Sequence, residues 1–227
     1  MWRASDCIGK IELLHTMGDD LMVVNAARVS FHKESKQMTG GDAKLIQYLA
    51  KHDHVSPFFH PQIQFRIKMP IFVAREWYRH TVGFSRNEVS RRYVDSEPEC
   101  WIPSVDDLRE KDANIKQGSK DSKDSFYEND ELRRDVHNRL KGAIEESVRS
   151  YKIALSVNLA PEIARSILPQ SMYTEFIETG SLAAYARLYK LRTSPDAQRE
   201  IQVYARAIGE ILSQKFPFSW AALTSQE

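Results

Sequence analysis

A strict alternation of apolar and polar residues over positions 62–69 is the clearest pattern in the chain. Its apolar members share one face of an extended segment, and they are Ile63, Phe65, Ile67 and Met69. A period of two is typical of a strand with one buried face, so the segment predicts a half-buried antiparallel strand. A second strand is expected over residues 8–16.

Helical spacing of apolar residues dominates most of the remaining chain. The predicted helices cover residues 19–29, 43–51, 70–80, 130–156, 161–168, 181–192 and 196–215. In the first of them, the residues expected on the buried side are Leu21, Val24 and Ala27, with Val23 beside them. Asp42 is expected to cap the second helix, and Pro70 suits the first turn of the third.

Few strands among many helices indicate one α+β domain over residues 1–227. We expect a small antiparallel sheet flanked by several helices, with a helical C-terminal half. The chain shows no internal repeat and no clear linker. Residues 97–125 read as irregular, and the charged, Ser- and Gly-rich segment 111–124 is expected to be a mobile surface loop.

Composition limits the class of protein. The chain has 227 residues, of which 42% are apolar and 28% charged, and its net charge is +1, as is ordinary for a globular domain. No apolar run approaches the roughly 20 residues of a membrane span. The N-terminus lacks the apolar core of a signal peptide. We therefore expect a cytoplasmic protein with no membrane partner.

Several common catalytic designs have little support. Cys7 and Cys100 lie far apart and form no metal-type pair. The glycine-rich motifs of dinucleotide and P-loop sites do not occur. The spacing of His52, His54 and His60 is compatible with metal ligation, but acidic or cysteine partners are poorly defined. We therefore predict no metal site and interpret these side chains as loop histidines.

Positive charge concentrates in residues 79–93, which hold four arginines, one histidine and a single acid. On a chain of net charge +1, this favours a specific anionic ligand over a broad nucleic-acid surface. Arginine suits bidentate recognition of phosphate and of base edges. A solvated basic loop is the alternative. Arg165 and Arg192 lie at helix boundaries, and each either pairs with a surface acid or points into a polar pocket.

Ordered motif matches extend along nearly the whole chain. They fall at residues 17–21, 26–31, 45–49, 54–58, 70–75, 79–80, 87–90, 92–93, 164–169, 173–174, 191–192, 197–198 and 200–201. In these segments the chain resembles the flavin-dependent thymidylate synthases, a family distinct from the thymidylate synthases that use a cysteine. A chance origin for so many ordered matches is improbable.

The resemblance implies the fold of that family and methylation of dUMP at C5 to give dTMP. It also implies methylenetetrahydrofolate as carbon donor, FAD reduced by NADPH as hydride source, and a homotetramer with shared active sites. No nucleic-acid partner is implied. Two alternatives stay open, which are hydroxymethylation of dUMP on the same scaffold and a non-catalytic nucleotide- or nucleic-acid-binding protein.

The resemblance further assigns site residues. The positions implied to contact dUMP are Glu76, Arg79, Glu88, Val89, Ser90, Arg91, Arg92, Arg165 and Arg192. The positions implied to contact FAD are Ser56, Arg79, His80, Thr81, Glu88, Ser181, Leu182, Ala183 and Arg187, with His54 near flavin and folate. Ser90 and Arg192 are the implied catalytic residues. An arginine beside the uracil imide favours its anion, which activates the ring.

The chain departs from the family pattern mainly on the flavin side. Thr81 replaces an arginine, and the loop before Ser90 is one residue longer than usual. Glu76 stands where the family often has glutamine. We expect Arg86 or Arg187 to replace the lost positive charge.

Overall fold

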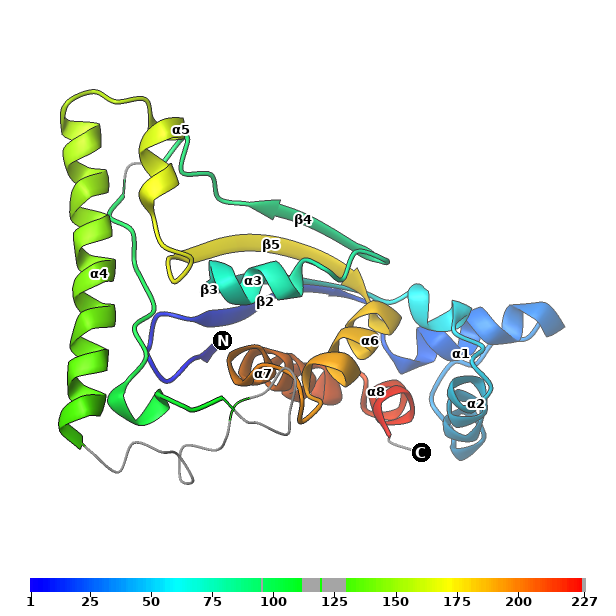
Figure 1. Ribbon diagram of the computed structural model, residues 1–227. Coiled ribbons are helices and arrows are strands. Elements are labelled where there is room, and N and C mark those ends of the chain that lie inside the picture. Colours follow the sequence, from blue (N-terminus) through cyan, green and yellow to red (C-terminus); the bar gives the residue numbers. More distant parts are fainter. Residues whose placement is uncertain (95, 112–118, 120–129, 226–227) are drawn as a thin grey trace.

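The computed structural model describes residues 1–94, 96–111, 119 and 130–225, so most of the predicted mobile loop 111–124 lies outside the described residues. Within them, an antiparallel sheet of five strands has the order β1-β2-β3-β5-β4 (Figure 1). The strands are β1 Trp2–Arg3, β2 Lys10–Met17, β3 Gln62–Pro70, β4 Phe84–Glu88 and β5 Tyr173–Ser181. The predicted α+β class with a small antiparallel sheet is confirmed.

The alternating segment forms the central strand β3, as predicted. Ile63, Phe65, Ile67 and Met69 are each fully buried. Their polar neighbours lie on the opposite face, where Lys10 and Arg66 form ion pairs with Glu175 at 3.1 and 3.8 Å. This face of the sheet is therefore polar and charged.

The sequence did not predict β4 and β5. The expected helical C-terminal half is confirmed, and among the described residues β5 is the strand that lies within it. In both strands, more buried and more exposed residues alternate, but polar residues occupy several of the positions that face the core. In β5 the buried residues include Thr174 and Glu178, and in β4 Arg86 faces the same side as Phe84. A hydrophobicity pattern cannot identify such strands, because their buried face is partly charged.

Helices account for most of the remaining described chain. Their bounds are α1 Asp20–Arg28, α2 Gly40–Lys51, α3 Ile71–Trp77, α4 Asp130–Ser156, α5 Pro161–Ala164, α6 Leu182–Arg192, α7 Arg199–Lys215 and α8 Pro217–Thr224. Short 3₁₀ turns add η1 Val29–Phe31, η2 Ser56–Phe59, η3 Val105–Asp107 and η5 Arg165–Ile167. All the predicted helices are present, whereas α8 was not predicted.

Two details of the predicted helices were wrong. Thr39, rather than Asp42, caps α2, and Asp42 completes a capping box by accepting from the Thr39 backbone N–H at 3.0 Å. In α1 the buried apolar residues are Val23 and Val24, as predicted, whereas Leu21 and Ala27 are only half-buried. The helix packs against α2 and η2.

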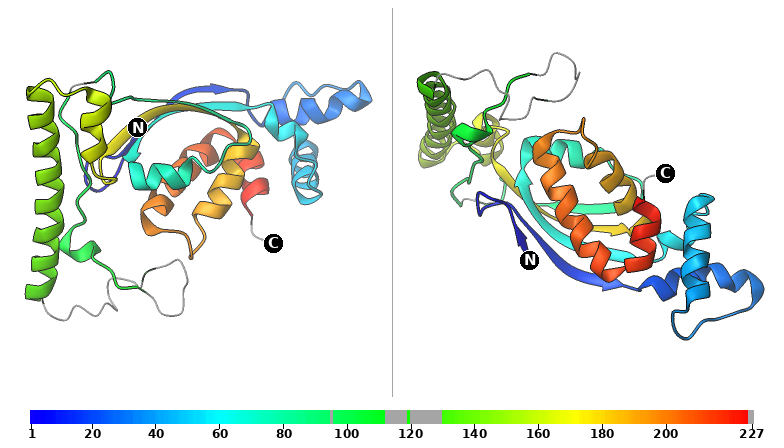
Figure 2. Two further views of the ribbon diagram at one scale, coloured as in Figure 1. Left: turned by 45° about the horizontal axis from the view of Figure 1, so that its top comes forward. Right: turned by 90° about the horizontal axis from the view of Figure 1, so that it is seen from below.

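The helices α3, α6 and α7 cover one face of the sheet, which arches over them (Figure 2). Large aromatic side chains fill the layer between sheet and helices, including Trp77 from α3 and Tyr185 from α6, both fully buried. The arm formed by α1 and α2 extends from one end of the sheet. The long helix α4 stands beyond the other end (Figure 1).

The start of α6 is fixed to the turn that precedes β4. Ser181 ends β5 and caps α6, because its Oγ accepts from the Ala184 N–H at 3.2 Å. The Ser181 N–H donates to the Gly83 carbonyl oxygen at 3.1 Å. Gly83 has a φ of 81°, and a Cβ there would lie 3.0 Å from the Ala184 Cβ. The turn can therefore pack tightly only with glycine at this position.

The close approach of β5 to β4 gives a first testable prediction. A Cβ at Gly180 would lie 2.5 Å from two ring carbons of Phe84 and 2.9 Å from the Tyr185 ring. We expect Gly180→Ala to lower the free energy of unfolding by roughly 1–3 kcal/mol, measured by urea denaturation at fixed protein concentration.

Gly142→Ala is the matched control, because nothing lies within 4 Å of a Cβ at this position in α4. It should leave stability unchanged or raise it by up to about 1 kcal/mol, since alanine favours a helix. Equal stability of the Gly180→Ala variant and the parent would contradict the tight packing described above.

Candidate active site

A fully buried carboxylate, Glu178 of β5, lies between the sheet and the helices. The indole Nε1 of Trp77 donates to both of its oxygens at 3.2 Å. Arg86 of β4 forms an ion pair with it through Nε and Oε2. The guanidinium carbon of Arg86 also lies over the rings of Phe84 and Tyr78, at 4.9 and 5.4 Å from their centroids. This cluster ties the edge strand to the core.

Burial raises the pKa of Glu178, although Arg86 and the Trp77 hydrogen bond act in the opposite direction. Burial and the neighbouring Glu178 also raise the pKa of the fully buried Tyr185 hydroxyl well above its usual value. Arg86 is therefore committed to Glu178, with only 15% of its side chain exposed. The prediction that Arg86 could supply the missing flavin-side charge is not supported by this arrangement.

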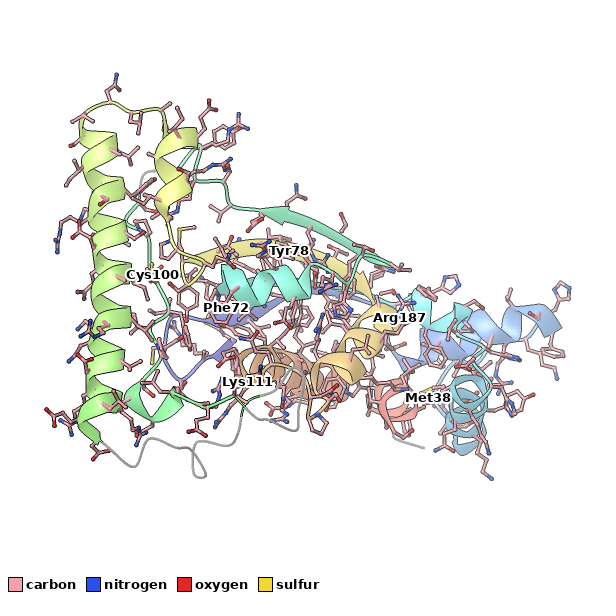
Figure 3. The ribbon with its side chains drawn as sticks, in the orientation of Figure 1. Met38, Phe72, Tyr78, Cys100, Lys111 and Arg187 are labelled. Atoms are coloured by element: carbon pink, nitrogen blue, oxygen red, sulfur yellow. The ribbon has the colours of Figure 1, made fainter. Side chains whose placement is uncertain are left out.

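Arg187, the other candidate for that charge, lies on the exposed side of α6. Its Nη2 donates to the Val82 carbonyl oxygen at 2.7 Å, and its guanidinium lies 5.6 Å from the centroid of the Phe59 ring. Figure 3 shows the side chain at the junction of α6 with η2. The side chain is exposed there, so its other N–H groups can reach a ligand that lies beside the turn at residues 81–84.

Three predicted site residues meet at the C-terminal ends of α3 and α6. Arg192 donates from Nε to His80 Nε2 at 2.9 Å, from Nη1 to Glu76 Oε2 at 3.2 Å, and from Nη2 to the Glu76 carbonyl oxygen at 3.0 Å. Resemblance implied each residue separately, but not this contact between them. We call Glu76, His80 and Arg192 the arginine clamp.

The contact with Arg192 determines the protonation of His80. Arginine is always a donor, so His80 Nε2 must accept, and the ring proton is then on Nδ1. Burial lowers the pKa of His80 to about 4, and the positive charges of Arg192, Arg86 and Arg187 add to this effect. The imidazole is therefore neutral and offers an Nδ1–H donor.

The clamp also determines what Arg192 can offer a ligand. In the described structure three of its five N–H groups are used by Glu76 and His80. The side chain is 19% exposed, so part of it is accessible to a ligand. A fixed guanidinium of this kind suits a planar ligand that carries acceptor oxygens.

Residues 88–92, which are predicted to contact dUMP, begin at the C-terminal end of β4, away from the turn at residues 81–84. Glu88 Oε1 accepts from the Thr174 hydroxyl at 2.5 Å, and the Val89 N–H donates to the Glu175 carbonyl oxygen at 2.9 Å. The chain then turns at Ser90, whose Oγ accepts from the Arg92 N–H at 3.3 Å. The Arg92 guanidinium is exposed and lies over the Tyr93 ring.

The structure brings the other predicted residues together only in part. Ser56, Thr81, Leu182, Ala183 and Arg187 belong to η2, the turn before β4 and the start of α6, which adjoin one another. Arg165 lies instead on η5, which packs beside α4 and precedes β5, whereas α6 follows the other end of β5 (Figure 1).

The remaining assigned side chains lie at exposed or half-buried positions. Arg79 is exposed just beyond α3, and the half-buried Arg91 donates to the Ser96 carbonyl oxygen. His54 is exposed and packs with His52 against Tyr48. Among the described residues, no three His, Cys, Asp or Glu side chains are grouped as a metal site. No described helix combines the length and apolar character needed to cross a membrane.

Comparison with known proteins gives a consistent result. The family model described as "Thymidylate synthase complementing protein" matches residues 12–218. The flavin-dependent thymidylate synthase of Thermus thermophilus is 39% identical over 94% of this chain and 75% of its own length. That of Thermosipho africanus is 38% identical over 94% of this chain and 90% of its own length.

A solved structure resembles the whole fold. It is a UMP/dUMP methylase, PolB from Streptomyces cacaoi, bound with 5-Br dUMP. The TM-score is 0.82 and the sequence identity 30%, with 95% of this chain and 94% of that chain covered. The arrangement of sheet and helices described above is therefore similar to that of this UMP/dUMP methylase.

The buried ion pair gives a second testable prediction. We expect Glu178→Ala to lower the free energy of unfolding by roughly 3–5 kcal/mol, because Arg86 would be left with an unpaired charge in the core. Chemical denaturation measures the effect. Glu175→Ala is the control on the other face of the same strand, and its loss should stay below about 1 kcal/mol. Similar losses for the two variants would contradict the role assigned to Glu178.

His80 gives a third prediction, which concerns pH. We expect its ring resonances in an NMR titration to show a midpoint near pH 4. The unfolded side chain takes up a proton below about pH 6.5, so this group should reduce stability as the pH falls from about 6.5 to about 4.

Arg192→Ala measures how much of the lowered pKa of His80 comes from Arg192 rather than from burial. Removal of the nearest positive charge and donor should raise the His80 midpoint toward its usual value. A midpoint near pH 6.5 in the parent protein would show that Nε2 does not serve as an acceptor for Arg192.

Proposed function

The chain belongs to the thymidylate synthase complementing protein family, that of the flavin-dependent thymidylate synthases, and from this premise we propose that it converts dUMP to dTMP by reductive methylation at C5. The observation that carries the proposal is the arginine clamp. It presents a fixed, charged guanidinium in a part of the fold shared with a methylase bound to 5-Br dUMP.

The chemistry of C5 methylation accounts for Arg192. Bond formation at C5 requires electron density at that carbon, and loss of the imide N3 proton supplies it by leaving negative charge on the ring oxygens and nitrogen. A guanidinium already held by Glu76 and His80 can meet this charge without reorganising. Arg192 is accordingly proposed as a catalytic residue. Ser90 is proposed to hold the ring or sugar from the exposed turn after β4.

The phosphate of dUMP is proposed to meet arginines of the 88–92 segment. Arg92 is exposed, Arg91 is half-buried and donates to the Ser96 carbonyl oxygen, and two neighbouring guanidinium groups suit a phosphate. Arg165 is proposed to contribute from another subunit, because its segment η5 precedes β5 and packs beside α4, whereas Arg192 ends α6, which follows the other end of β5 (Figure 1).

The residues on the flavin side fit FAD by their donor chemistry. Arg79 and Arg187 offer exposed guanidinium groups, His80 offers Nδ1–H, and Ser56 offers a hydroxyl. Gly83 lets the turn at residues 81–84 pack closely against the start of α6, where a side chain would not fit. Bound FAD would supply the hydride, with NADPH as its reductant and methylenetetrahydrofolate as the carbon donor. His54 is proposed to lie near the flavin and folate.

A homotetramer with shared active sites is also part of the proposal. In α4 the buried residue is Tyr151, whereas Leu140 and Ile153 are 42% and 56% exposed. The helix packs against α5, η3 and η5, and exposed apolar side chains along it favour packing against further copies of the chain. We propose that the enzyme acts in the cytoplasm, where dUMP, folate and NADPH occur together.

The two alternative functions are less well supported. The similar curated proteins bear the name of thymidylate synthases, so hydroxymethylation of dUMP is not favoured over methylation. A non-catalytic nucleic-acid-binding protein would be expected to carry a broad basic surface, whereas this chain has a net charge of +1.

A visible absorption spectrum tests the proposed site. Protein incubated with FAD and then desalted should keep its flavin bands, and added dUMP should shift them. Arg187→Ala should weaken FAD binding roughly 10- to 100-fold, through the loss of a charge-assisted hydrogen bond. Arg206→Ala, an exposed arginine of α7 that donates to Gln202, is the matched control.

A colourless protein, or bands that dUMP leaves unchanged, would contradict a shared flavin–uracil site. An Arg187→Ala variant with full flavin affinity would contradict only the assignment of the replacement charge to Arg187.

A further inference from the structure

One buried hydroxyl group near the proposed nucleotide segment 88–92 has no role in the site described so far. It belongs to Tyr78, which follows α3 and lies in the layer between that helix and β5 (Figure 3). The Tyr78 ring packs edge-on against Phe176 of β5, with 5.1 Å between the ring centroids. The guanidinium carbon of Arg86 on β4 lies 5.4 Å from the same Tyr78 centroid. Side chains from two strands therefore fix the position of this ring.

The same contacts place the Tyr78 hydroxyl beside Glu88. On β4, Glu88 lies two residues after Arg86 and thus on the same face, and its register partner on β5 is Phe176. Burial raises the pKa of Tyr78, and the charge and hydrogen-bonding capacity of the Glu88 carboxylate raise it further. The hydroxyl oxygen is buried, yet no described residue accepts from it in ordinary hydrogen-bond geometry. A buried donor of this kind requires a physical explanation.

Within the described part of the chain, one side-chain donor holds the Glu88 carboxylate. Its Oε1 accepts from the Thr174 hydroxyl at 2.5 Å, and the side chain is otherwise exposed at the end of β4. The cation of the same strand, Arg86, is already paired with Glu178. The last torsion of a glutamate has broad minima, so a single donor leaves the carboxylate free to turn. A second donor would fix both oxygens and still leave lone pairs for a ligand.

We propose that Tyr78 is a positioning residue, whose hydroxyl donates to the Glu88 carboxylate and holds it, together with Thr174, in place for the nucleotide. The inference rests on the proposed function, in which residues 88–92 contact dUMP. A small turn of the carboxylate completes the bond, because the hydroxyl already lies beside it. The Tyr78 ring also contacts Arg86, so the nucleotide contact is connected to the buried ion pair of Arg86 and Glu178.

Tyr78→Phe tests the inference, because it removes the hydroxyl and keeps the ring. We expect the FAD-loaded variant to bind dUMP about 10-fold more weakly in a calorimetric titration, since the carboxylate loses one of its donors. Its midpoint in urea denaturation should stay close to that of the parent, because the ring contacts remain. In a Glu88→Ala background there is no carboxylate to position, so the same change should alter dUMP affinity by less than about 2-fold.

Tyr151→Phe is the matched control, because this tyrosine of α4 also has a buried hydroxyl without a partner among the described residues. It should leave dUMP affinity unchanged. Parent-like affinity in Tyr78→Phe would overturn the inference and leave the proposed function standing. An equal loss with and without Glu88 would do the same, since it would indicate a purely structural role for Tyr78.

Two further outcomes would reach beyond Tyr78. Parent-like dUMP affinity in Glu88→Ala would overturn the inference together with the placement of Glu88 at the nucleotide. A parent protein that does not bind dUMP would overturn the proposed function and this inference together.

Discussion

The ion pair between Arg86 and Glu178 is the constraint on which the rest of the site depends. Removing two charges from water costs several kcal/mol per ion unless each finds a close partner and further hydrogen bonds. Glu178 meets this requirement with Arg86 from β4 and Trp77 from α3. An edge strand and a helix are thus held against the central sheet by one carboxylate.

The position of α3 determines the geometry of the arginine clamp. Trp77 is anchored beneath β5, so its neighbours at the end of the same helix are fixed as well. Glu76 and His80 then face the end of α6, where Arg192 completes three hydrogen bonds. On the other side, Ser181 and Gly83 join the start of α6 to the turn before β4. Arg187, proposed for the flavin side, and Arg192, proposed for the uracil side, are therefore positioned by the same helix, α6.

The sequence predicted those parts of the fold whose buried faces are apolar. Strand β3 and helix α4 follow directly from their periodicities, and both are present at the expected positions. Strands β4 and β5 were missed because Arg86, Thr174 and Glu178 occupy core-facing positions, and nothing local reveals that a distant residue neutralises them. Resemblance supplied the names of the site residues. It could not show that Arg86 is paired inside the core, or that Glu76 binds Arg192, because both contacts join segments about 90 or more residues apart.

The identity of the nucleotide product tests the central claim most directly. Mass spectrometry would identify the nucleotide formed when the protein is incubated with dUMP, FAD, NADPH and methylenetetrahydrofolate, and each component would be omitted in turn. The account predicts dTMP in the complete mixture and none when FAD or the folate is left out. Recovery of unchanged dUMP from the complete mixture, or of 5-hydroxymethyl-dUMP as the released product, would contradict it.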